Sequence, residues 1–121
     1  MSNTPWKSDK WFVSPWNYKE EVISEFRFAD EIKIHDITLR DGEQQAGIVM
    51  NLEEKVRIAK ALSEAGVHRI EAGMPIVSAD DEAAIKEIVD LNLDAEIFSF
   101  ARCMVPDVLM AKACGVKGII V

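Results

Sequence analysis

Short alternating segments and longer amphipathic segments follow one another along most of this chain. The segment EIKIHDIT, which begins at residue 31, alternates isoleucine with polar residues and predicts a strand over residues 32–38. Apolar residues three and four positions apart then predict a helix over residues 52–65. Asn51 with Glu54 forms a capping pair before this helix, and Gly66 ends it.

The same succession of strand and helix is repeated further along the chain. VHRIEAG predicts a second strand, and Ser78 with Asp81 predicts the cap of a second helix. The apolar face of this helix is expected to hold Ile85, Ile88 and Val89.

A third repeat begins with AEIFSFA, which predicts the third strand. Pro106 suits the first turn of a third helix, whose apolar face is expected to carry Val108, Leu109 and Ala113. After Gly115, the segment KGIIV is typical of a buried fourth strand.

Strands that alternate with amphipathic helices predict an α/β fold with a parallel sheet, either open and doubly wound or closed into a barrel. A doubly wound sheet would be expected to carry a glycine-rich phosphate loop after its first strand, but the segment here is TLRDGEQQAG. The barrel is therefore favoured. A (β/α)8 TIM barrel needs eight strands, so we expect this chain to hold about the first four, as a truncated first half.

Residues 1–28 differ from the rest of the chain, because they carry seven of its nine aromatic residues and show no regular period. We expect them to form an N-terminal extension that precedes the barrel domain of residues 29–121. Aromatic side chains gain much from burial. The extension is therefore expected to cover one end of the barrel or to contact a partner subunit, and the sequence leaves both open.

Composition excludes several classes of function. The net charge of −7 and the pI near 4.8 repel nucleic-acid phosphates and anionic lipids, so neither nucleic acid nor membrane is expected as a partner. Cys103 and Cys114 fit no metal or disulfide pattern, and no segment has the length and apolarity of a membrane span or a secretory signal. These features indicate a cytoplasmic protein.

Polar residues gather where the first predicted strand ends, between Thr38 and Gln44. Barrel enzymes hold their active sites at this end of the strands. Arg40 and Asp41 could be an ordinary ion pair, yet a carboxylate that binds a divalent cation beside an arginine that binds a carbonyl oxygen suits the polarisation of a 2-oxo acid. This strand end is the candidate site.

The motif D-I-T-L-R-D-G-E-Q resembles the signature that opens the catalytic barrels of isopropylmalate, homocitrate and citramalate synthases and of hydroxymethylglutaryl-CoA lyase. The resemblance continues through NLEEKVRIAKALSEAGVHRIEAGMP, FARC and KACGVKGIIV, and so covers residues 32–121. It implies the pyruvate carboxyltransferase type of TIM-barrel domain.

The resemblance also implies roles for four residues. Arg40 corresponds to the catalytic arginine that binds the 2-oxo acid, and Asp41 to a metal-ligating carboxylate. Gln44 corresponds to a substrate-binding glutamine and Glu71 to an inward catalytic acid. From the residues alone, Glu71 could equally be an ion-paired residue of the barrel interior, with Arg69 or Arg102 as its partner.

The reaction that the resemblance implies for the parent enzyme is Claisen condensation of an acyl-CoA with a 2-oxo acid, on a divalent metal (Mg²⁺, Mn²⁺ or Zn²⁺), in a homodimer. E-A-G-M-P favours the synthases over the lyases. Cleavage by an acyl-CoA lyase or aldolase of the same family is one alternative, and a non-catalytic half-barrel assembly piece is the other. The family's further metal ligands lie in a later His-x-His pair, and we assign neither His35 nor His68 to metal.

Overall fold

The computed structural model describes residues 4–121, which form two compact units divided between Ile32 and Lys33. The first unit contains the short helices η1 (Pro15–Tyr18) and α1 (Glu20–Ile23). It does not bury its own aromatic residues, since Trp11, Phe12 and Trp16 are all at least half exposed. That these rings cover one end of the barrel or contact a partner subunit stays a prediction.

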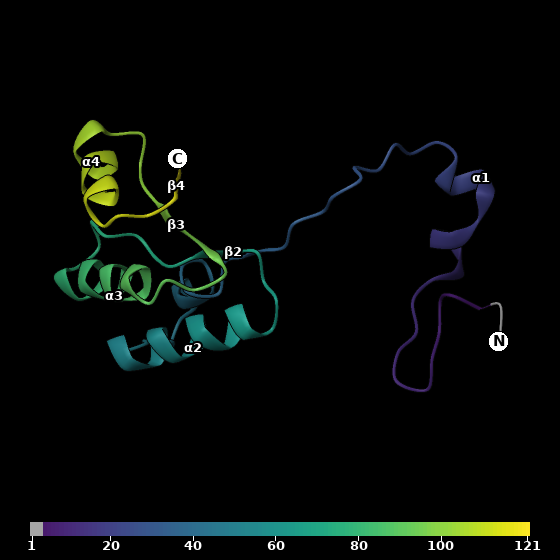
Figure 1. The fold of residues 1–121 in the computed structure, drawn as a ribbon, viewed down its shortest axis with the longest axis horizontal. Helices are drawn as coiled ribbons and strands as arrows, with labels where there is room; N and C mark the ends of the chain where they lie inside the picture. The colour runs from purple at the N-terminus through teal and green to yellow at the C-terminus, as the bar shows by residue number, and fades with distance from the viewer. Residues whose placement is uncertain (1–3) are drawn as a thin grey trace. The chain divides into compact units, whose positions relative to one another are not determined.

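The second unit alternates strands with helices, as the sequence predicts (Figure 1). Its elements are β1 (His35–Asp36), η2 (Gly42–Gln44), α2 (Leu52–Glu64), β2 (Arg69–Glu71), α3 (Ala79–Asp90), β3 (Glu96–Phe100), α4 (Val105–Ala113) and β4 (Gly118–Ile120).

The four strands pair in parallel in the order β1-β2-β3-β4, so each strand lies beside its neighbour in the sequence. The helices α2, α3 and α4 follow one another along one side of the sheet (Figure 1). A doubly wound sheet reverses its strand order and carries helices on both faces. The observed order and layering are those of the first half of a TIM barrel.

An apolar core lies between the sheet and its helices. Ile70 from β2 and Ile85 and Ile88 from α3 are fully buried there, and Ala59 of α2 packs into the same cluster. The predicted caps are confirmed, because Asn51 and Glu54 form a reciprocal capping box and the Ser78 side chain accepts a hydrogen bond from the Asp81 amide. Local signals thus fix where both helices begin.

Two predictions about the elements need correction. The first strand spans two residues instead of residues 32–38. It ends at Asp36, whose carboxylate accepts hydrogen bonds from the Thr38 amide at 2.9 Å and from the Thr38 hydroxyl at 3.2 Å. Such a local turn competes with the sheet ladder. The apolar face expected for the third helix is also wrong, since Leu109 is exposed and α4 is buried through Asp107 and Ala111 instead.

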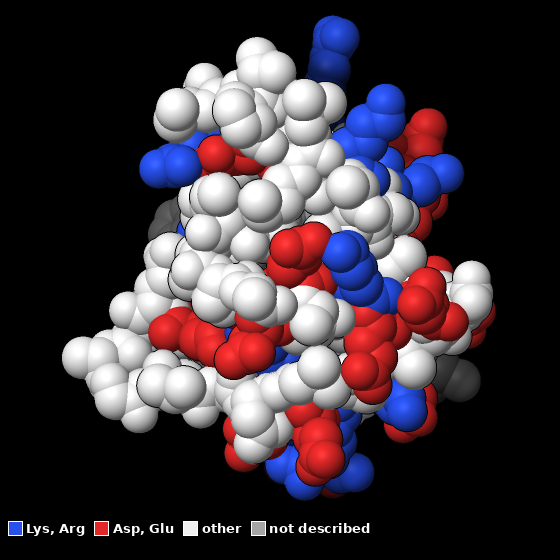
Figure 2. Space-filling model, turned by 90° about the vertical axis from the view of Figure 1, so that its left-hand side faces the viewer, with Lys and Arg blue, Asp and Glu red and all other residues white. Residues whose placement is uncertain are grey.

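The side of the molecule toward which α2 and α3 point with one end is mixed in charge (Figure 1 and Figure 2). Figure 2 shows acidic and basic side chains interspersed over its lower part, whereas its upper part is largely uncharged. Exposed apolar residues lie in and around α4, among them Met104, Val105 and Leu109. Within residues 4–121, no helix combines the length and apolarity needed to cross a membrane.

Candidate active site

The strand alternation separates the core from the site. Ile70 and Ala72 face the helices, and Glu71 between them points to the opposite face of the sheet. Phe98 and Phe100 from β3 bring their rings to the same polar side chains as Glu71. The residues of this second face come from three neighbouring strands and the turn after β1.

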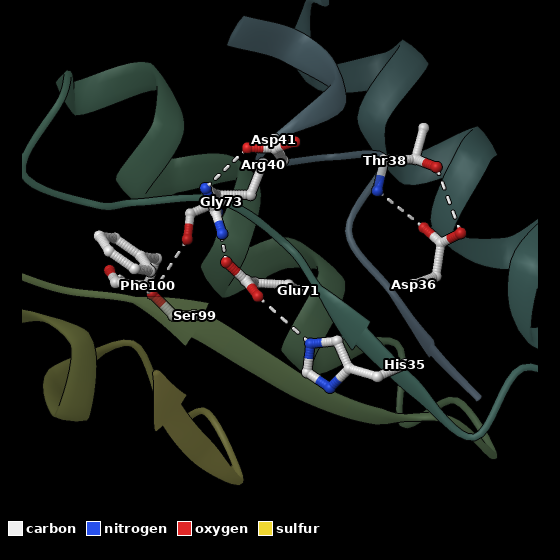
Figure 3. Close-up of polar contacts among 9 residues, drawn as sticks. All are labelled: His35, Asp36, Thr38, Arg40, Asp41, Glu71, Gly73, Ser99 and Phe100. Carbon is white, nitrogen blue, oxygen red and sulfur yellow. Dashed lines mark hydrogen bonds and ion pairs between the residues drawn. The ribbon is translucent and has the colours of Figure 1, made fainter. Parts of the chain in front are cut away.

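Arg40 is the centre of this arrangement (Figure 3). Its Nε atom donates to Oε1 of Glu71, its Nη1 atom lies 3.1 Å from Oδ1 of Asp41, and its Cζ atom lies 4.6 Å from the centroid of the Phe100 ring. Contacts to the carboxylates and to the ring fix a planar guanidinium far better than they would a lysine. Arg40 is thereby oriented before any ligand binds.

Glu71 holds Arg40 from the next strand. Its side chain is only 3% exposed, and both of its oxygens are engaged, Oε1 by Arg40 and Oε2 by Nε2 of His35 at 3.2 Å. A buried carboxylate is tolerated when its charge is paired and its oxygens are hydrogen-bonded. Glu71 is therefore bound to Arg40 and His35, and not to Arg69 or Arg102 as the sequence had left open.

The turn after β1 fixes the backbone beneath Arg40 and Asp41. The Ile37 carbonyl accepts hydrogen bonds from the amides of Arg40, Asp41 and Gly42 at 3.1, 2.9 and 3.2 Å. With the Asp36–Thr38 contacts, these bonds wind the chain into a tight turn that leads directly into η2. The motif DITLRDG thus encodes its own local structure.

Asp41 faces solvent beside Arg40. Its side chain is 56% exposed, and Arg40 binds only one of its two oxygens among the described contacts. An accessible carboxylate oxygen is a suitable ligand for a hard divalent cation. Within residues 4–121, no group of three potential metal-ligating side chains comes together.

Gln44 lines a cavity beside Arg40. The cavity has a volume of about 300 Å³ and is lined by Arg40 and Gln44 from the β1 side and by Gly73, Met74 and Val77 from the segment after β2. Three of the four predicted residues, Arg40, Asp41 and Glu71, are in one contact chain. Gln44 joins Arg40 at the cavity wall without a direct contact.

His35 and Phe100 are the site residues that the sequence analysis did not find. The parallel register pairs His35 with Arg69 and so brings His35 beside β2, whereas Phe100 joins the site through the contact of its ring with Arg40. Arg69 binds Glu96 at 3.0 Å and lies 5.2 Å from the centroid of the Phe98 ring, and Arg102 binds Asp107 at 2.6 Å. His68 accepts a hydrogen bond from the Ile34 amide at 3.0 Å, which is a structural role.

The family model for HMGL-like proteins matches residues 31–121, which include all of the sheet and the whole contact chain around Arg40. The chain belongs to the HMGL-like family. This membership confirms the resemblance that the motif around Arg40 indicated.

Relatives of the chain within this family are synthases. It is 44% identical over 111 residues to a homocitrate synthase AksA from Methanothermobacter thermautotrophicus, covering 92% of the chain and 27% of that protein. It is 44% identical over 108 residues to a 2-isopropylmalate synthase from Methanocaldococcus jannaschii, covering 84% and 21%. A putative (R)-citramalate synthase CimA from Archaeoglobus fulgidus is 49% identical over 89 residues, covering 74% and 18%.

The HMGL-like chain therefore spans about a quarter or less of the length of these curated relatives. The matched region carries Arg40, Asp41 and Glu71 at the ends of the first two strands of the sheet.

Proposed function

We propose that the full-length protein carrying this chain condenses an acyl-CoA, such as acetyl-CoA, with a 2-oxo acid in a metal-dependent Claisen reaction. The observation that carries the proposal is the Arg40 guanidinium, held at a strand end between buried Glu71 and exposed Asp41. Relatives named as homocitrate, 2-isopropylmalate and citramalate synthases support the same reaction class.

Arg40 has the chemistry to bind the 2-oxo acid. A base removes a proton from the acyl methyl group, and the resulting carbanion attacks the carbonyl carbon of the 2-oxo acid. The carbonyl oxygen then becomes an alkoxide that takes up a proton, and water hydrolyses the thioester to release CoA. A donor that is already oriented toward a developing oxyanion lowers the barrier of such a step, and Glu71 supplies that orientation to Arg40.

Asp41 is the residue of this chain that would hold the metal. A bound divalent cation would act as a Lewis acid toward the 2-oxo acid. Because residues 4–121 contain no cluster of three potential ligands, the proposal requires further ligands from the rest of the full-length protein. We infer that Gln44, which lines the cavity beside Arg40, contacts the bound substrate.

The test is an assay of the purified full-length protein with acetyl-CoA and a panel of 2-oxo acids, in which release of free CoA thiol is measured. We expect turnover with at least one 2-oxo acid, its loss on chelation and its recovery on addition of Mg²⁺, Mn²⁺ or Zn²⁺. Asp41→Asn should raise the metal concentration needed for half-maximal activity. Release of acetyl-CoA from a hydroxyacyl-CoA without condensation would instead identify a lyase.

We also propose that the full-length protein is a homodimer, with the aromatic rings that residues 4–32 leave exposed as part of the contact. Sedimentation equilibrium should give twice the monomer mass, and deletion of residues 1–32 should shift the equilibrium toward the monomer. A protein that stays monomeric over the accessible concentration range would contradict this.

A further inference from the structure

A buried lysine lies on the side of α2 that packs on the rest of the fold. Val56 and Ala59 of this helix join the apolar core, and Lys55 beside them is only 3% exposed. Lysine is rarely this buried unless its charge is paired. The Lys55 ammonium is therefore expected to be paired within the fold.

The Lys55 ammonium is bound by two carboxylates from two other elements. Its Nζ atom lies 2.7 Å from Oε2 of Glu43, in η2, and forms an ion pair with Oδ1 of Asp81, in the first turn of α3. Both carboxylate side chains are at most about a fifth exposed, at 22% and 15%. We refer to Glu43, Lys55 and Asp81 as the lysine cluster.

The lysine cluster keeps its central charge. Burial alone lowers the pKa of Lys55, but the hydrogen bonds and the negative charges of Asp81 and Glu43 outweigh it and raise the pKa above the ordinary lysine value. The raised pKa favours the charged form of Lys55, which binds both carboxylates.

Each carboxylate of the lysine cluster also holds a loop. Oε1 of Glu43 accepts a hydrogen bond from the Met50 amide at 3.1 Å. This bond joins the two ends of the segment that contains Gln44. Oδ2 of Asp81 accepts a hydrogen bond from the Ser78 hydroxyl at 2.6 Å, which fixes the start of α3 after the loop that follows β2. Both carboxylates line the cavity of about 300 Å³ that also holds Arg40 and Gln44.

We propose that Lys55 is a positioning residue, which locks the turn after β1 and the loop after β2 together and so sets the shape of the cavity beside Arg40. Lys55 does not line that cavity itself, so it acts through Glu43 and Asp81. The kinetic part of this inference rests on the proposed function, whereas its structural part does not.

The experiment compares three variants of the full-length protein. Lys55→Met keeps the length of the side chain and removes its charge, and Glu43→Gln weakens one arm of the cluster while it keeps the shape. Lys86→Met is the matched control, because Lys86 also pairs with a carboxylate, Glu82, but is exposed on the outer side of α3.

Hydrogen exchange of residues 41–50 is the first readout, and it requires no activity. We expect exchange in this segment to accelerate by about tenfold or more in Lys55→Met, to accelerate less in Glu43→Gln and to stay unchanged in Lys86→Met. Unchanged exchange in a folded Lys55→Met variant would overturn the proposal. If that variant does not fold, unchanged exchange in Glu43→Gln would overturn it.

The second readout is the kinetics with the 2-oxo acid. A misplaced site costs up to about 100-fold in rate, so we expect kcat/KM for the 2-oxo acid to fall by about 10- to 100-fold in Lys55→Met, mainly through KM. A merely stabilising lysine would lower the Tm and leave KM unchanged at a temperature where the variant is folded. If the wild type has no condensing activity, the proposed function fails while the exchange experiment still decides the role of Lys55.

Discussion

Single residues of this site depend on their neighbours for their chemistry. Arg40 lies in a tight turn that its own segment forms, but the orientation of its guanidinium comes from Glu71 on β2 and Phe100 on β3. The charge of Glu71 in turn is tolerated because Arg40 and His35 occupy both of its oxygens. A substitution at any of these positions is therefore expected to change the orientation of the Arg40 guanidinium.

Arg40→Lys tests the geometry of the guanidinium at constant charge. Lysine has no forked donor and would lose the simultaneous contacts to Glu71 and Asp41. We expect kcat to fall by about 10²- to 10³-fold, the cost typical of a lost oxyanion donor, and the Tm to fall as well, because the buried Glu71 carboxylate loses part of its pairing. Steady-state kinetics of the full-length protein measure this. Arg69→Lys, on the half-exposed pair with Glu96, is the control and should keep near-normal activity.

His35→Phe tests the support of Glu71. Phenylalanine keeps the ring that meets Phe98 edge-on, but it leaves Oε2 of buried Glu71 without its donor. An unsatisfied buried acceptor costs about 1–3 kcal/mol. We expect a loss of that size in the free energy of unfolding, measured by urea denaturation, together with reduced kcat. A variant as stable as the wild type would mean that the His35 contact contributes nothing to Glu71.

At the scale of the elements, the start of each helix is set by its cap or by its first-turn residues, and not by its apolar face. Asn51 caps α2, Ser78 caps α3, and α4 begins at Val105 with Pro106 in its first turn. In α4 the buried first-turn residue is Asp107, which Arg102 binds through Nε and Nη2 at 2.6 and 3.1 Å. This pair anchors the helix to the loop after β3.

Asp107→Asn tests that anchor through pH. The hydrogen bonds and charge of Arg102 hold the pKa of the Asp107 carboxyl below its ordinary value of 3.8. Because the folded pKa is the lower one, the pair stabilises the fold above the ordinary pKa, and this stability is lost as pH falls through the folded pKa. We expect Asp107→Asn to be less stable at neutral pH and to lose less stability below about pH 4. Thermal unfolding across pH measures both, with Asp94→Asn as an exposed control.

At the scale of the whole molecule, the described sheet has two outer strands. β1 pairs with β2 alone and β4 with β3 alone among residues 4–121, and exposed apolar side chains lie near β4 at Met104, Leu109 and Val121. Open strand edges and apolar patches promote association.

The 121-residue chain by itself is therefore expected to self-associate. Its sedimentation coefficient should rise with concentration, and it should bind a hydrophobic dye more strongly than the full-length protein does. A monodisperse monomer with cooperative unfolding would contradict this expectation. A single defined oligomer with no enzymatic activity would instead support the half-barrel as an assembly piece.

The sequence by itself determined the local features of this protein. Periodicity and caps located α2 almost to the residue and the start of α3, and the motif around Arg40 identified the strand end that carries the candidate site. These features depend on residues within about one turn of each other, so their physics is contained in a short segment.

Only the tertiary structure decided the contacts between segments distant in sequence. It paired Glu71 with Arg40 and His35, turned the buried side of α4 away from Leu109, and buried Lys55 between Glu43 and Asp81. Periodicity reports which face of an element is apolar, but the partner of a buried charge is set by strand register and helix packing. The contacts of Glu71 and Lys55 join residues that are 12 to 36 positions apart along the chain.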